Sequence, residues 1–137
     1  MNLAEQAVAF FEDDHNCAQS VLMAVGPQWG LDAALARRVA APFGGGIVGQ
    51  GRTCGAVTGA LMAIGLRYGD APTVEMEAAA AAFLERFRAR HTTTVCKELL
   101  RLDIGISDEL EWAREEGVFA TRCTQFVRDA VEILGEL

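Results

Sequence analysis

The stretch FGGGIVGQGRTCGAVTG, residues 43–59, decides between two fold classes. Gly44, Gly46 and Gly49 spell the dinucleotide pattern G-x-G-x-x-G, and the run GIVGQGRT is one residue away from a phosphate-binding P-loop. Both motifs require a strand before the loop, so that the following helix points its amino terminus at the phosphate. The preceding segment, LDAALARRVAAPF, instead has helical spacing and carries a proline near its end. The stretch therefore predicts a loop between two helices, and nucleotide binding is disfavoured.

Helical signals also run through the rest of the chain. Capping residues such as Asn2 and Asn16 precede segments in which apolar residues recur at helical spacing. The expected helices lie at residues 3–11, 17–25, 31–40, 54–68, 73–90, 96–102, 107–117 and 123–134. No alternating strand pattern occurs, and TTTV at residues 92–95 is too short to form one. We expect an all-α fold in which residues 1–137 form one compact domain of about six to eight helices.

Charge and composition restrict the partners of the chain. Its 137 residues carry a net charge of −7, and the Lys and Arg residues are scattered, which disfavours nucleic acid and anionic membranes. Apolar runs fall short of the ~20 residues that span a bilayer, and the amino terminus lacks a secretion-signal pattern. We therefore expect a cytoplasmic protein without membrane insertion. In a reducing cytoplasm, the four cysteines would be buried fillers, metal ligands or redox groups.

The four cysteines share a local position. Each follows a residue type that caps helices and precedes a helical pattern: Cys17 follows Asn16, Cys54 follows Thr53, Cys96 comes two residues after Thr94, and Cys123 two after Thr121. All four thiols are thus expected in the first turn of a helix, where free N–H groups and the helix dipole lower the pKa of a thiol. No C-x-x-C pair occurs, so a shared site must be assembled from four helices.

Cys54 is the expected lead thiol because of the residues around it. Thr53 would cap its helix, and the cation of Arg52 would favour the thiolate. Four glycines near Cys54 are candidates for binding a cofactor or for letting another element come close: Gly45, Gly46, Gly55 and Gly59. A glycine inside a helix costs about 1 kcal/mol relative to alanine, so the last two need a compensating role.

Together these residues resemble a known family. The chain is similar to the redox-active protein family named for four cysteines and a C-G-A-x-x-G motif, written C-GCAxxG-C-C. The matching segments are NCAQSVLMA at Cys17, GGGI before the motif, CGAVTGALMAIGL from Cys54, CKELL at Cys96 and CTQFVRDAVEIL at Cys123. They span residues 16–134 in the family's order, and no motif cysteine is missing. The resemblance implies a small domain that works in thiol or electron-transfer chemistry, without an established substrate.

Three functions are left open. In the first, the chain is a thiol–disulfide redox protein in which Cys54 attacks, another cysteine resolves, and a redox partner protein or small thiol supplies electrons. In the second, the four cysteines hold a metal ion or an iron–sulfur cluster. In the third, the cysteines are core residues of a non-catalytic interaction domain. His15 and His91, which precede Cys17 and Cys96, could serve as a base or ligand near a thiol.

Overall fold

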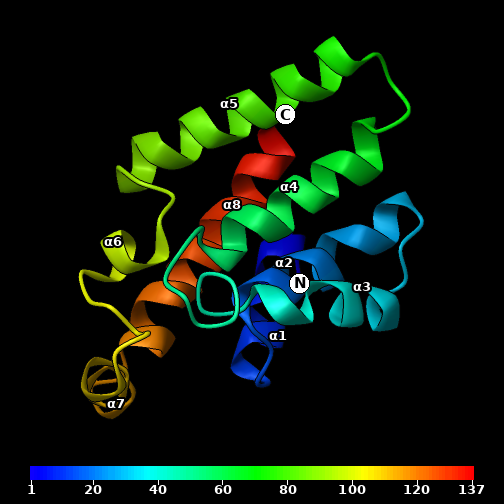
Figure 1. The fold of residues 1–137 in the computed structure, drawn as a ribbon. Helices are drawn as coiled ribbons and strands as arrows, with labels where there is room; N and C mark the ends of the chain where they lie inside the picture. Colours follow the sequence, from blue (N-terminus) through cyan, green and yellow to red (C-terminus); the bar gives the residue numbers. More distant parts are fainter.

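The computed structural model describes all residues 1–137 and consists of eight α-helices with short 3-10 and π segments (Figure 1). The helices are α1 (Leu3–Glu12), α2 (Cys17–Val25), α3 (Ala33–Ala40), α4 (Gly55–Tyr68), α5 (Thr73–His91), α6 (Cys96–Leu100), α7 (Ser107–Glu115) and α8 (Thr124–Glu136). No strand forms, since the TTTV segment contributes only an isolated bridge between Thr53 and Val95. The predicted all-α class is confirmed. None of the helices combines the length and the apolar character needed to cross a bilayer.

Helix α2 lies at the centre of the core and packs against α1, α3, α4 and α8. It is buried along most of its length, including Val21, Leu22 and Val25. Its most extensive contact is with α4, which presents small residues to it. The Cβ that Gly59 lacks would lie 2.8 Å from the carbonyl oxygen of Ala18, so this approach requires glycine. Small residues therefore let the amino-terminal halves of α2 and α4 pack closely.

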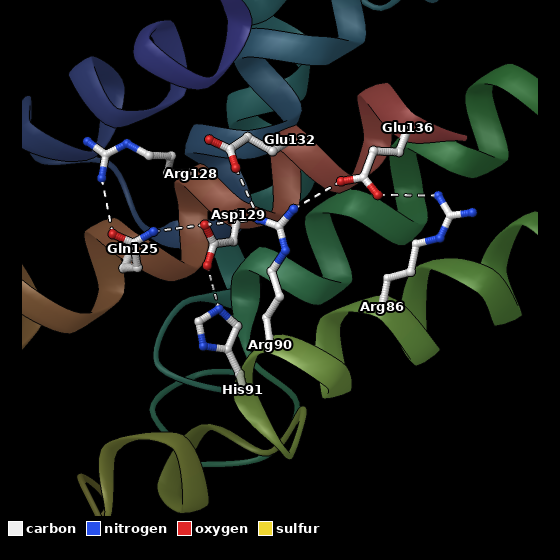
Figure 2. A network of polar contacts seen from close by, with 8 residues as sticks. All are labelled: Arg86, Arg90, His91, Gln125, Arg128, Asp129, Glu132 and Glu136. Atoms are coloured by element: carbon white, nitrogen blue, oxygen red, sulfur yellow. Dashed lines mark hydrogen bonds and ion pairs between the residues drawn. The ribbon is translucent and has the colours of Figure 1, made fainter.

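Helix α5 is fixed along α8 by a buried apolar face and by a polar network (Figure 2). Nε2 of His91 lies 2.7 Å from Oδ2 of the buried Asp129, and Arg90 lies 3.2 Å from Oδ1 of the same carboxylate. Arg90 also contacts Glu132 at 3.0 Å and Glu136 at 2.9 Å. Because a buried carboxylate is costly without partners, Asp129 ties the carboxyl end of α5 to α8.

Two of the helix ends that differ from the sequence expectation have a clear local reason. Helix α3 begins at Ala33 rather than at residue 31, because the side chain of Asp32 accepts a hydrogen bond from the N–H of Leu35 and caps the helix. Helix α6 ends at Leu100 rather than at residue 102. The next residue, Arg101, has a left-handed backbone with φ of 58°, which ends the helical hydrogen bonding.

The glycine-rich stretch forms a loop between α3 and α4, as predicted, and it coils tightly on itself (Figure 1). Its left-handed glycines, at positions 45, 46, 49 and 51, have φ angles between 61° and 70°, a conformation that glycine adopts without steric cost. The N–H of Gly51 donates to the carbonyl of Gly45 at 3.1 Å, and the N–H of Arg52 donates to that of Gly46 at 2.9 Å. The coil carries the chain back to the amino end of α4.

Candidate functional site

An open cavity of about 880 Å³ lies where the amino-terminal ends of α2, α4 and α6 meet the early turns of the last helix. All four cysteines line it: Cys17, Cys54, Cys96 and Cys123. Cys54, Cys96 and Cys123 are buried, with exposed fractions of 4%, 7% and 8%, whereas Cys17 is partly exposed. All four are free thiols. The fold thus gathers side chains that are far apart in the sequence around one space.

Cys17 is the first residue of α2, as the sequence predicted, and a capping box holds this turn. The Asn16 side chain accepts a hydrogen bond of 2.8 Å from the N–H of Gln19, and the Gln19 side chain accepts one of 2.9 Å from the N–H of Asn16. Asn16 also donates to the carbonyl of Ala41, 3.1 Å away, which ties the turn to the end of α3. Cys17 therefore lies beside the free N–H groups of a helix amino terminus.

Cys54 and Cys96 are held near each other by a short antiparallel contact. The N–H of Cys54 donates to the carbonyl of Thr94 at 2.8 Å, and the N–H of Cys96 donates to the carbonyl of Arg52 at 2.5 Å. This pairing sets Cys54 opposite Thr94 and Cys96 opposite Arg52, so the two cysteines are diagonal neighbours across the contact.

Thr53 does not cap α4, which corrects the sequence expectation. It pairs instead with Val95 in the isolated bridge, and Cys54 itself occupies the capping position before Gly55. Gly55 then allows α2 to approach, because its missing Cβ would lie 3.1 Å from the Cβ of Cys17. Cys54 thus lies at the start of α4, one residue earlier than predicted, with no side chain capping the helix.

Cys123 is not in the first turn of a helix, contrary to the prediction. The backbone turns at Gly117, with φ of 68°, and helical structure resumes before Cys123 as a π-helix, Phe119–Cys123, that continues directly into α8. Thr121 donates its hydroxyl to the carbonyl of Gly117 at 3.1 Å and does not act as a cap. Single π turns inside helices often occur at functional sites, and this one ends at Cys123.

Burial raises the pKa of Cys54 to about 12, so the predicted lowering is wrong. The backbone N–H groups of Ala56 and Val57 do lower it, as expected at a helix start, but the loss of solvent has the larger effect. Burial, followed by the negative charges of Cys123 and Asp103, also raises the pKa of Cys96 to about 12. These two thiols are protonated at neutral pH.

Cys17 and Cys123 form a directly interacting pair. A hydrogen bond from the Cys17 thiol lowers the pKa of Cys123 below its ordinary value, although burial opposes this effect. The same hydrogen bond, followed by burial, raises the pKa of Cys17 well above its ordinary value. The pair therefore shares its protons, and Cys123 is the sulfur that ionises first.

Of the other site residues predicted from the sequence, some line the cavity and some do not. Gly45, Gly46 and Gly55 line the cavity, while Gly59 does not, because it packs against α2. Arg52 is exposed and does not line the cavity, and no contact of its side chain with a cysteine supports its predicted role.

The two histidines lie in different parts of the structure. His15 lines the cavity, and its Nδ1 lies 3.0 Å from the carbonyl oxygen of Phe10, to which it can donate a hydrogen bond. His91 does not line it and instead bonds to Asp129. Arg114 of α7 lines the cavity and was missed, because the pattern of α7 predicts an apolar face without indicating which neighbour it meets.

The four thiols do not form a metal site in this arrangement. No group of three or more His, Cys, Asp or Glu side chains is placed so that it could hold a metal ion. A tetrahedral thiolate site requires four sulfurs at about 2.3 Å from one point. The four cysteines line one cavity but are not placed as the ligands of a single metal ion would be. The reaction proposed below therefore uses no metal.

The chain belongs to a family of four-cysteine proteins. Residues 15–137 match the family model described as Putative redox-active protein (C_GCAxxG_C_C). The match includes all four cysteines and the CGAVTG motif, and it bears out the resemblance seen in the sequence. No curated protein and no solved structure matches the chain.

Proposed function

We propose that this member of the redox-active family is a thiol–disulfide redox protein whose working pair is Cys17 and Cys123. One observation carries the proposal: Cys17 and Cys123 line one cavity with the other two cysteines and interact directly there, which lowers the pKa of Cys123 and raises that of Cys17. Two cysteines that interact directly are candidates for a disulfide, which needs Cα atoms ~4.4–6.8 Å apart. The lowered pKa of Cys123 supplies the thiolate that disulfide exchange requires.

The reaction consists of two exchange steps. The Cys123 thiolate attacks one sulfur of a substrate disulfide, forms a mixed disulfide and expels the other sulfur as a thiolate. The mixed disulfide removes the thiolate of Cys123, and with it the largest cause of the raised pKa of Cys17. Cys17 then gives its proton to solvent and attacks the Cys123 sulfur, which closes the Cys17–Cys123 disulfide and releases the second substrate thiolate. Each released thiolate takes up one proton, one matching the proton that Cys17 loses and the other drawn from solvent, and the substrate gains the two electrons that the pair loses. A small thiol or a partner protein returns the pair to the dithiol by the reverse steps.

Cys54 and Cys96 have a different part in this proposal. A thiol whose pKa is about 12 is almost entirely protonated at neutral pH and attacks disulfides slowly. Both sulfurs are buried in the walls of the cavity, and the chain pairing between residues 52–54 and 94–96 holds them in place. We therefore assign them no attack step and expect them to shape the cavity around the working pair.

The proposal is tested by measuring the rate at which iodoacetamide alkylates each cysteine across a pH series, in reduced protein purified without oxygen. Mass spectrometry of the digested protein follows each site separately. Cys123 should react at lower pH than the other three cysteines. In a Cys17→Ala variant the alkylation of Cys123 should shift to higher pH, because the hydrogen bond that stabilises its thiolate is gone.

A Cys54→Ala variant is the matched control, since it removes a thiol from the same cavity without removing that hydrogen bond. It should leave the pH profile of Cys123 close to that of the unmodified chain. If Cys54 reacts first, or if Cys17→Ala leaves the Cys123 profile unchanged, the assignment of the pair is wrong. Elemental analysis of the same preparation would favour the metal-binding alternative if it found a stoichiometric metal.

A further inference from the structure

The size and depth of the thiol cavity restrict what can reach the working pair. Cys123 has an exposed fraction of 8% and lines the cavity, whose volume of about 880 Å³ falls in the range of small-molecule sites. A disulfide on the surface of a folded protein would have to enter this space before a sulfur could attack it in line. A compact molecule enters without rearranging the walls.

The walls of the cavity are largely apolar. Leu99 and Leu100 of α6, Ile104 after it, and Phe119 and Phe126 near Cys123 supply much of the lining. Such walls favour a substrate whose groups next to the sulfurs are short carbon chains, because burying apolar area contributes roughly 25 cal/mol per Å². They disfavour polar or charged groups close to the disulfide unless the cavity offers those groups a partner, since they would otherwise lose their hydration.

The charged residues that line the cavity favour a substrate with positively charged ends over one with negatively charged ends. Glu12 and Asp14, at the end of α1, contribute two exposed carboxylates to the lining, and Arg114 contributes the one guanidinium. Arg114 lies on α7, whose sequence SDELEWARE carries four acidic residues and no other basic one. The chain as a whole has a net charge of −7. An anionic substrate is therefore repelled both by the rim and by the overall field.

We infer that the cavity takes a compact disulfide with short carbon arms and positively charged ends, of the kind formed by oxidation of a small aminothiol. This inference rests on the proposed thiol–disulfide function and adds the class of its substrate. In this inference one sulfur of the disulfide meets Cys123, and the carboxylates of Glu12 and Asp14, which line the same cavity, attract its ammonium ends. The exchange steps are those described above, with two aminothiol molecules as the reduced products.

The test compares three small disulfides as oxidants of the reduced protein: cystamine, which is cationic, bis(2-hydroxyethyl) disulfide, which is neutral, and oxidised glutathione, which is anionic. Each rate is divided by the rate of the same disulfide with free 2-mercaptoethanol, which removes differences in intrinsic reactivity. We expect the normalised rates to fall in the order given, with cystamine about tenfold above oxidised glutathione at low salt. The ratio should shrink as salt is added, because exposed charges are screened.

A double variant, Glu12→Gln with Asp14→Asn, should bring the cystamine and glutathione rates together. Asparagine suits position 14, where the backbone has φ of 68°. The matched control, Glu75→Gln with Glu77→Gln, removes the same charge from α5, where neither residue lines the cavity, and should leave the ratio nearly unchanged.

The outcomes separate the two proposals. If none of the three disulfides oxidises the protein faster than it oxidises the free thiol, the thiol–disulfide function itself fails. If the pair is oxidised but the normalised rates are equal, or oxidised glutathione is preferred, the function stands and the inferred substrate class is wrong. Reduction of a protein disulfide, with insulin as the probe, as fast as that of cystamine would also overturn the inference.

Discussion

Replacing Gly46 with alanine should destabilise the protein more than the same replacement at Gly49. Both glycines have left-handed backbones, with φ of 68° and 70°, and an alanine in that conformation costs roughly 1–2 kcal/mol. Their surroundings differ. A Cβ at Gly49 would meet nothing within 4 Å, whereas one at Gly46 would lie 2.6 Å from the backbone nitrogen of Arg52 and 2.7 Å from the Cβ of Cys96. The stability loss of Gly49→Ala therefore measures only the cost of placing alanine in a left-handed conformation.

The difference between the stability losses of the two variants measures how closely the loop packs against Cys96. Forcing a methyl group into a packed region costs about 1–3 kcal/mol. We thus expect a loss of about 1–2 kcal/mol in Gly49→Ala and about 2–5 kcal/mol in Gly46→Ala. A difference of about 1–3 kcal/mol corresponds to a change of roughly 5- to 150-fold in the unfolding equilibrium constant.

Urea unfolding followed by far-UV circular dichroism gives both free energies, provided that the two variants share the same dependence on denaturant. Alkylation of Cys96 in the folded protein is the second readout, and it should be faster in Gly46→Ala than in Gly49→Ala because the clash displaces the Cys96 turn. Equal losses of stability together with equal Cys96 reactivity would refute the reasoning, since they would mean that the loop does not press on Cys96.

Two further predictions concern stability. The pKa of Cys54 and of Cys96 is raised from an ordinary value near 9 to about 12. Both thiols are protonated in the folded and the unfolded chain below about pH 9, and above it the unfolded chain loses these protons first. The unfolding free energy should therefore fall as the pH rises from about 9 to about 12. Alanine at either position should flatten this fall, by up to about 1.4 kcal/mol per pH unit, and an unchanged slope in urea unfolding would contradict the burial effect. Gly59→Ala should lower the melting temperature, because the new Cβ would lie 2.8 Å from the carbonyl oxygen of Ala18. The control Gly65→Ala, exposed on the same helix with nothing within 4 Å, should raise stability by about 0.5–1 kcal/mol, and a similar gain at Gly59 would show that α2 and α4 are not in close contact.

The helical order was accessible from the sequence because its signals are local. Asn2 and Asn16 cap α1 and α2 through the hydrogen bonds expected of their residue type, and the glycine-rich stretch forms a loop because no strand pattern precedes it. The two helix ends explained above depend on local detail: the Asp32 side chain caps α3, and the backbone angle of Arg101 ends α6. The left-handed conformation of Arg101, which shortens α6, has no sequence signature, since arginine rarely adopts it.

The site could be predicted from the sequence only in part, because the burial of a side chain depends on the whole fold. The shared position of the cysteines indicated one site, and the structure brings all four to one cavity. The predicted lowering of the Cys54 pKa considered the helix start and Arg52, which are local, and left out desolvation, which reverses the direction. The contact between Cys17 and Cys123 joins opposite ends of the chain, and no spacing rule could have singled it out.

The most direct test of the central claim is to map the first disulfide that forms when the reduced protein is oxidised. One equivalent of bis(2-hydroxyethyl) disulfide is added without oxygen, the remaining free thiols are alkylated, and the digested protein is analysed by mass spectrometry. We expect a Cys17–Cys123 disulfide, with Cys54 and Cys96 recovered in alkylated form. A first disulfide that includes Cys54 or Cys96, or the recovery of all four cysteines as alkylated thiols, would contradict it.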